Sequence, residues 1–188
     1  VWGGGGYRRS GDYRAPSGVV ANSDTSLGSG RFGAGWTGDR LFVSGGGQVE
    51  RNRFGVPFGG ELHQHAHEDA EGSDEDHVDE LFDIDIRSLR RELRFDGGLR
   101  ELENRFVDNI KATFAVVDYN HDELEVAGGA EEVATHFTND IRTLRAELEQ
   151  KRMGRLTGRI GTDWLGRDYA AEGEVVLSPP TTHRALSA

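Results

Sequence analysis

The sequence contains no cysteine, which excludes disulfide bonds, thiolate metal sites and a cysteine nucleophile. Long apolar runs are also missing. No stretch approaches the roughly 20 consecutive apolar residues that a membrane-spanning helix needs, so we expect no membrane span. These two absences leave a chain that must be held together by ordinary packing and hydrogen bonds.

Positive charge is scarce as well. Lys and Arg number 22 against 33 Asp and Glu, which gives a formal net charge of −11. A protein that coats nucleic acid needs a basic surface to neutralise phosphates, so we predict no specific nucleic-acid partner. The chain has 188 residues, of which 35% are hydrophobic, and this allows one domain or two small ones around a modest core.

Complete catalytic motifs are not found in the sequence. Gly28-Ser29-Gly30 lacks the spacing of a nucleophile elbow, and no glycine run is followed by the Gly-Lys-Ser/Thr of a phosphate loop. We therefore expect no enzymatic activity, no catalytic residue and no bound cofactor.

Glycine, in contrast, is abundant and unevenly distributed, because 17 of the 27 glycines lie within residues 1–60. Residues 1–28 show neither helical nor strand periodicity, which predicts an extended arm that becomes ordered only on a partner. Aromatic side chains bury a large area and arginines pair with acidic surfaces. The expected partner-binding residues of the arm are Trp2, Tyr7, Arg8, Arg9, Tyr13 and Arg14.

An internal repeat is the clearest pattern in the chain. Residues 82–93 and 137–148 are identical at eight of twelve positions. Their apolar residues recur with steps of +4, +4, +3 and +4, which is typical of one face of an amphipathic helix. We predict a helix near 130–152 and a second one at the first copy, although Phe82, Ile84 and Ile86 also alternate as a strand would. The two apolar sets are Val78, Phe82, Ile86, Leu89 and Leu93, and Val133, Phe137, Ile141, Leu144 and Leu148.

Short strands are expected between and around these helices. Segments 113–117 and 123–126 flank a polar stretch at 118–122 that is typical of a hairpin turn, and further strands are expected at 40–44 and 174–177. The predicted fold class is therefore α+β, with an extended Gly-rich N-terminal arm. The expected divisions are an arm at 1–28, a Gly-rich β segment at 29–60, an acidic loop at 61–77, an α+β region at 78–177 and a tail at 178–188.

The acidic loop contains the only stretch with metal-binding character. Residues 61–85 hold eleven carboxylates and no Lys or Arg, and histidines recur there at alternate positions. Alternate imidazoles project to one face of an extended backbone and, with a carboxylate, can bind a divalent metal. The candidate ligands are His63, His65, His67 and Asp69. A solvated acidic loop that binds ions only weakly is the favoured interpretation, since the longer metal motifs are incomplete.

Taken together, the arm, the repeat and the missing motifs favour a non-enzymatic structural subunit of a large multi-copy particle, with a virion protein such as a capsid, decoration or connector component as the leading example. The expected partners are other protein subunits in a homo- or hetero-oligomeric assembly. Two alternatives remain open at this level. One is a metal-binding protein or metalloenzyme that uses the histidine cluster, and the other is a cellular scaffold protein.

Overall fold

The computed structural model of the chain describes residues 1–58, 82–173 and 179–188, and these contain β-strands but no helix. Several strands are unusually long: two of them have 21 residues each, whereas strands commonly have five or six. The strands are β1 (Trp2–Ser10), β2 (Arg14–Ala15), β3 (Gly18–Val19), β4 (Thr25–Thr37), β5 (Leu41–Val56), β6 (Asp83–Leu99), β7 (Val107–Ala127), β8 (Ala130–Gln150), β9 (Arg159–Gly173) and β10 (Thr181–Ser187).

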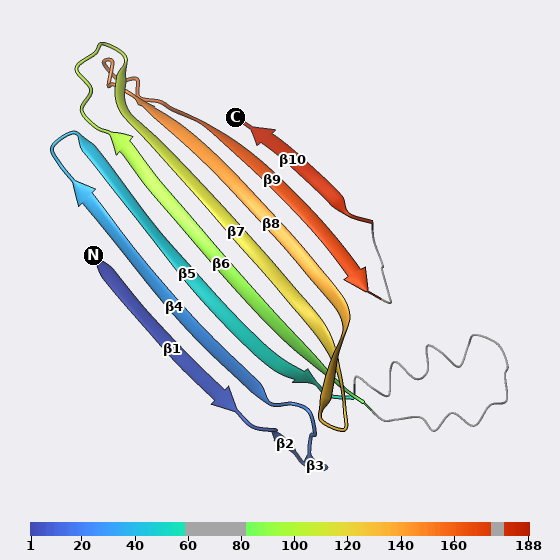
Figure 1. Cartoon of the computed structure of the whole chain (residues 1–188). Helices are drawn as coiled ribbons and strands as arrows, with labels where there is room; N and C mark the ends of the chain where they lie inside the picture. The colour runs from blue at the N-terminus through green and yellow to red at the C-terminus, as the bar shows by residue number, and fades with distance from the viewer. Residues whose placement is uncertain (59–81, 174–178) are drawn as a thin grey trace.

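Eight of these strands form one antiparallel sheet in the order β1-β4-β5-β6-β7-β8-β9-β10, while β2 and β3 form a small separate hairpin. Apart from this insertion, each strand pairs with the next one in the chain (Figure 1). The strands therefore run up and down as a meander. β1 lies at one edge of the sheet and β10 lies at the other.

The turn between β7 and β8 shows how the sequence sets this connection. Ala127 pairs with Ala130, which leaves Gly128 and Gly129 as a two-residue hairpin loop. Both glycines have positive φ values, of 58° and 87°, which residues with a Cβ adopt only at a cost. The glycine pair that we expected to precede a helix instead reverses the chain between two strands.

The predicted α+β fold class is wrong, because the copies of the repeat lie in strands β6 and β8 rather than in helices. A step of +4 keeps a residue on the same face of a helix and also on the same face of a strand. Only the +3 step distinguishes a helix from a strand. In a strand, an odd step places the apolar residues that follow it on the other face of the sheet. Thus Ile86 lies on one face while Leu89 and Leu93 lie on the opposite one.

Three further expectations are corrected or located by the structure. The stretch 118–122 is not a turn, since it lies within β7 together with both expected flanking strands. The prediction of an N-terminal arm that becomes ordered only on a partner is also wrong for residues 2–10, because these residues form β1 and pair with β4 of the same chain. The expected strand at 40–44 overlaps the start of β5, whereas that at 174–177 lies outside the described residues.

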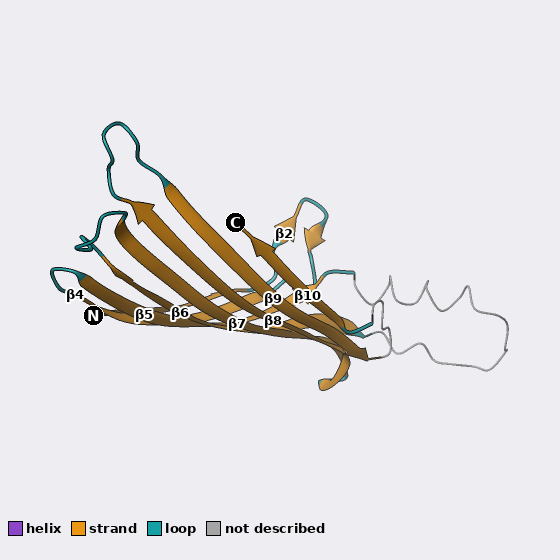
Figure 2. Ribbon diagram, turned by 90° about the horizontal axis from the view of Figure 1, so that it is seen from above, coloured by secondary structure: helices purple, strands orange, loops and turns teal. Residues whose placement is uncertain are grey.

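The sheet forms a single curved layer (Figure 2). Within the described residues the buried apolar side chains are only Val20, Leu124 and Ala171. A domain of ordinary architecture packs two layers around a hydrophobic core. Most apolar side chains of this sheet are instead left at its surface, so the two faces decide what the protein can contact.

Candidate functional site: an apolar belt opposite a polar face

Residues paired across neighbouring strands lie on the same face of a sheet, so the register assigns each side chain to one of two faces. One row of paired residues runs through Phe95, Phe114, Leu144, Trp164 and Leu186, from β6 to β10. The neighbouring rows on this face are also apolar. We call this surface the apolar belt; it consists of Phe32, Ala34, Trp36, Leu41, Val43, Leu93, Phe95, Leu99, Ile110, Ala112, Phe114, Val116, Leu144, Ala146, Leu148, Ile160, Trp164 and Leu186.

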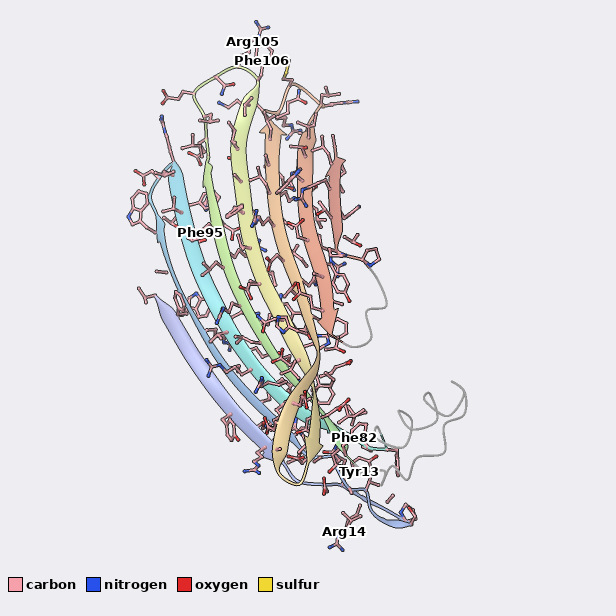
Figure 3. The ribbon with its side chains drawn as sticks, turned by 45° about the vertical axis from the view of Figure 1, so that its right-hand side comes forward. Tyr13, Arg14, Phe82, Phe95, Arg105 and Phe106 are labelled. Carbon is pink, nitrogen blue, oxygen red and sulfur yellow. The ribbon has the colours of Figure 1, made fainter. Side chains whose placement is uncertain are left out.

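The belt is exposed. Phe95 is 52% accessible, Trp36 58% and Leu144 47%, although none of the three lies on an edge strand of the sheet. Figure 3 places Phe95 well inside the sheet, away from its ends. Monomeric proteins rarely leave contiguous apolar patches of this kind in water, and larger ones mark sites of contact with other molecules.

The belt has a limited height along the strands. On β6 it extends from Leu93 to Leu99 and on β7 from Ile110 to Val116, which is roughly 20 Å at the rise of an antiparallel strand. Beyond Leu93 and Val116, the next row on the same face is charged from β6 to β9 and consists of Arg91, Asp118, Asp140 and Asp168. The apolar surface is therefore a band across the sheet and not a whole face.

The opposite face is polar at the same height. Arg94 donates to Asp96 from Nε to Oδ2 at 2.9 Å and from Nη2 to Oδ1 at 3.1 Å, and the Thr113 hydroxyl donates to Oδ1 at 2.7 Å. The Arg94 guanidinium, the main cause, and the Thr113 hydroxyl together hold the pKa of Asp96 below its usual value. Asp96 is thus a carboxylate at neutral pH with its partners in place.

A second set of ion pairs continues this polar face. Arg145 Nη2 lies 2.8 Å from Glu147 Oε1 on β8, and Arg145 Nη1 lies 3.5 Å from Asp163 on β9. Arg90 and Glu92 form another pair on β6, at 2.7 Å. Leu144 of the belt and Arg145 of the polar face are adjacent in sequence. Successive residues of the strand thus place an apolar and a charged side chain on opposite faces.

Beyond the belt, toward the end of the sheet that carries β2 and β3, the belt side becomes polar as well. Asp122 accepts hydrogen bonds from Arg87 Nη2 at 2.9 Å and makes a 2.5 Å contact with His136 Nδ1. Burial would raise the pKa of Asp122, but the hydrogen bonds from His136 and Arg87 outweigh it and hold the pKa below its usual value. Arg53 contacts Asp85 at 2.6 Å and Glu131 at 2.8 Å in the same region.

His121 is the one described side chain with a buried polar atom, Nδ1, that has no hydrogen-bond partner. Its ring stacks on Phe137 with centroids 4.3 Å apart. Burial lowers the pKa of His121, because the charged imidazolium would lose its hydration there. The side chain therefore behaves as a neutral, aromatic packing group.

The residues expected to bind partners are placed in two locations. Trp2, Tyr7, Arg8 and Arg9 belong to β1, and Tyr13 and Arg14 lie at or in β2. Figure 3 shows Tyr13 and Arg14 at the opposite end of the molecule from Arg105 and Phe106. Trp2 is 56% and Tyr7 72% exposed, so both stay available for the partner contacts that we predicted.

The predicted metal ligands His63, His65, His67 and Asp69 lie outside the described residues. Among the residues that are described, no group of three or more His, Asp or Glu side chains is arranged to hold a metal ion. The metal-binding alternative therefore stays a prediction from the sequence.

The belt was not predicted from the sequence, although its signal is present there. Leu93, Phe95 and Leu99 alternate with charged or small residues, and so do Ile110, Phe114 and Val116. The period of two is clear once these segments are known to be strands. The pattern was not recognised because successive residues of a strand point to opposite faces, so the belt residues of one strand are not consecutive in the sequence.

Comparisons with known proteins add no assignment: no protein-family model matches the chain, and no curated protein matches it either. Within the described part of the chain, no helix is capable of crossing a membrane.

Proposed function

We propose that the chain is a non-enzymatic structural unit of a larger sheet assembly, whose apolar belt lies against the hydrocarbon of a lipid membrane. The belt itself carries the proposal, because it is contiguous across the sheet, limited in height and opposed by a charged face. A structural, non-enzymatic role agrees with the expectation from the sequence. The particle expected there, a virion, is not retained, since lipid suits this surface better than a neighbouring shell subunit.

The energetic cost of leaving the belt in water supports a covering environment. Twelve of its large side chains are at least 39% exposed. Fully burying such a side chain contributes about 1.5–3 kcal/mol, so covering the exposed half of each contributes about 1 kcal/mol. The sum is on the order of 10 kcal/mol, comparable to the whole stability of a typical domain. We therefore expect a sheet whose belt stays in contact with water to aggregate or unfold.

Lipid fits the belt better than a second protein layer does. On β5 the belt side carries no charged or polar side chain from Leu41 as far as Val49, which lies just beyond the belt, and this stretch of nine positions is close to the roughly 9–11 residues with which a strand crosses a bilayer. Two successive belt-side positions of β5 are glycines, Gly45 and Gly47, and the side chains of Phe95 and Leu93 lie over them. Fluid acyl chains fill such an uneven surface, whereas a second protein layer would need a matching shape. The expectation of no membrane span was based on the lack of long apolar runs. A strand with alternating apolar and polar residues contains no such run, so that observation does not apply to it.

Lipid contact also requires further strands. A backbone N–H or C=O group without a partner in hydrocarbon costs several kcal/mol, and the outer sides of β1 and β10 are not paired by any described strand. We therefore propose that both edges are completed by strands of other segments or chains. This is the sense in which the protein is one unit of a larger assembly.

Refolding the chain with and without lipid tests the proposal. The 188-residue chain is diluted from urea into buffer or into phosphatidylcholine vesicles, and strand content and flotation with the vesicles are measured. We expect strand structure and flotation together only when vesicles are present. A folded, monodisperse dimer in lipid-free buffer would instead show that a second copy covers the belt, and the lipid proposal would fail.

A further inference from the structure

Several glycines in this sheet are covered by a large side chain from the strand next to them. At seven strand glycines, a Cβ would lie within 4 Å of a large apolar or aromatic side chain of the residue paired directly across. Large side chains over glycines stabilise a sheet by filling the gap that a missing side chain leaves. The pairs are Gly28 with Tyr7, Gly30 with Val49, Gly33 with Trp2, Gly45 with Phe95, Gly47 with Leu93, Gly97 with Val43 and Gly98 with Phe42.

Two glycines of β1 have no such cover on the belt side. A Cβ at Gly3 would meet only the backbone oxygen of Arg31, at 3.6 Å, and one at Gly5 would meet only backbone atoms of Ser29 and Gly30. On the polar side, Gly4 and Gly6 do have side-chain neighbours, from Arg31 and Ser29, each at 3.9 Å. The uncovered gap is therefore confined to the belt face of β1.

The same strand has an open edge. β1 is the first strand of the sheet and pairs only with β4 among the described strands, over nine consecutive residues without a register shift. It contains no proline, which would interrupt added pairing. Its edge can therefore accept another strand by main-chain hydrogen bonds.

We infer that β1 pairs with a partner strand that runs antiparallel to it and carries large apolar side chains, preferably aromatic ones, opposite Gly3 and Gly5. Residues opposite alternate positions lie on one face, so the partner strand has these two side chains two positions apart. They cover the two glycines as Phe95 covers Gly45 and Leu93 covers Gly47. The inference goes beyond the proposed function, because it holds whatever covers the belt.

The opposite edge strand, β10, does not supply such a strand in a second copy of the chain. The belt-side residues of β10 are Leu186, Arg184 and Thr182, only one of which is large and apolar. The partner strand is therefore expected to have a different sequence from β10.

Two nine-residue peptides test the inference against the folded 188-residue chain, held in the vesicles or detergent in which it folds. One peptide has Phe at its fourth and sixth positions and Thr or Lys elsewhere, and the other has Ala at these two positions. Cross-strand aromatic pairs stabilise by roughly 0.2–1 kcal/mol each, so with about 0.5 kcal/mol from each of the two Phe residues we expect the Phe peptide to bind about fivefold more tightly. Fluorescence anisotropy of labelled peptides measures both affinities.

Two matched variants separate the glycine gap from general edge pairing. Gly3→Val fills the gap on the belt side, whereas Gly4→Val adds the same side chain on the polar side, and neither Cβ comes closer than 3.6 Å to another residue. We expect Gly3→Val to remove the preference for the Phe peptide and Gly4→Val to keep it. Equal affinities of the two peptides for the unaltered chain, no binding of either peptide, or equal effects of the two variants would each overturn the inference. So would dimers linked through β1 and β10.

Discussion

Replacing Leu144 with lysine places a charge in the middle of the belt. Leu144 lies on β8 between Phe114 and Trp164 in the pairing, and its side chain is 47% exposed toward the belt side. A lysine facing lipid near the middle of the hydrocarbon costs about 2–4 kcal/mol, depending on depth. Arg142 is two positions away on the same face, so the new ammonium can approach the polar boundary, and the lower value is expected.

The matched control is Thr143→Lys, because Thr143 is the adjacent residue and faces the polar side. This substitution should change the free energy of unfolding by roughly 0.5 kcal/mol or less, as surface changes usually do. Both variants are unfolded by urea in phosphatidylcholine vesicles and followed by circular dichroism. A loss of about 2 kcal/mol for Leu144→Lys corresponds to a roughly 30-fold change in the folding equilibrium. Equal losses for both variants would refute the assignment of the faces.

Three further outcomes follow from individual residues. Asp96→Asn should lower stability at neutral pH. The pKa of Asp96 is lowered in the fold, so the difference from the unaltered chain should disappear as the pH falls below about 3.8 in urea titrations. The pKa of His121 is lowered by burial, so its neutral form favours folding and stability is lost as the pH falls below about 6.5. His121→Phe should remove the loss of stability that His121 causes between pH 7.5 and 5, so the urea midpoint of the variant should shift less over this range than that of the unaltered chain. Gly129→Val puts a β-branched residue at a φ of 87° and should destabilise by about 1–2 kcal/mol or more, whereas Gly128→Asn should be tolerated, as thermal unfolding would show.

The sequence contained the information for strands in β6 and β8, but in an ambiguous form. The repeated apolar steps of +4 agree with both a helix and a strand, and the single +3 step favoured the helix. Leu89, Arg90 and Glu92 are also strong helix formers, so local propensity does not favour the strand that forms there. Long-range pairing between β6 and β7 decides the structure, and pairing between residues 83 and 126 is not visible in a local window.

The candidate site was harder to predict than the fold. Phe95, Phe114 and Leu144 form one row only because of the register between β6, β7 and β8. A shift of one residue in any strand would move its apolar set to the polar face. Turn residues such as Gly128 and Gly129 fix part of this register, but their role is clear only when both flanking segments are known to be strands. The expected importance of Trp2 and Tyr7 stays a prediction, now located on the edge strand β1.

The central claim is that the belt face contacts hydrocarbon while the opposite face does not, and the positions of the tryptophans allow a direct test. Trp36 belongs to the belt and is 58% exposed, whereas Trp2 is 56% exposed on the polar face and pairs with Gly33, three positions from Trp36 on β4. Single-tryptophan chains are prepared by replacing the other tryptophans with Phe and are folded in vesicles whose acyl chains carry bromine. We expect strong fluorescence quenching of Trp36 and little quenching of Trp2. Equal quenching of both, or quenching of Trp2 alone, would contradict the account.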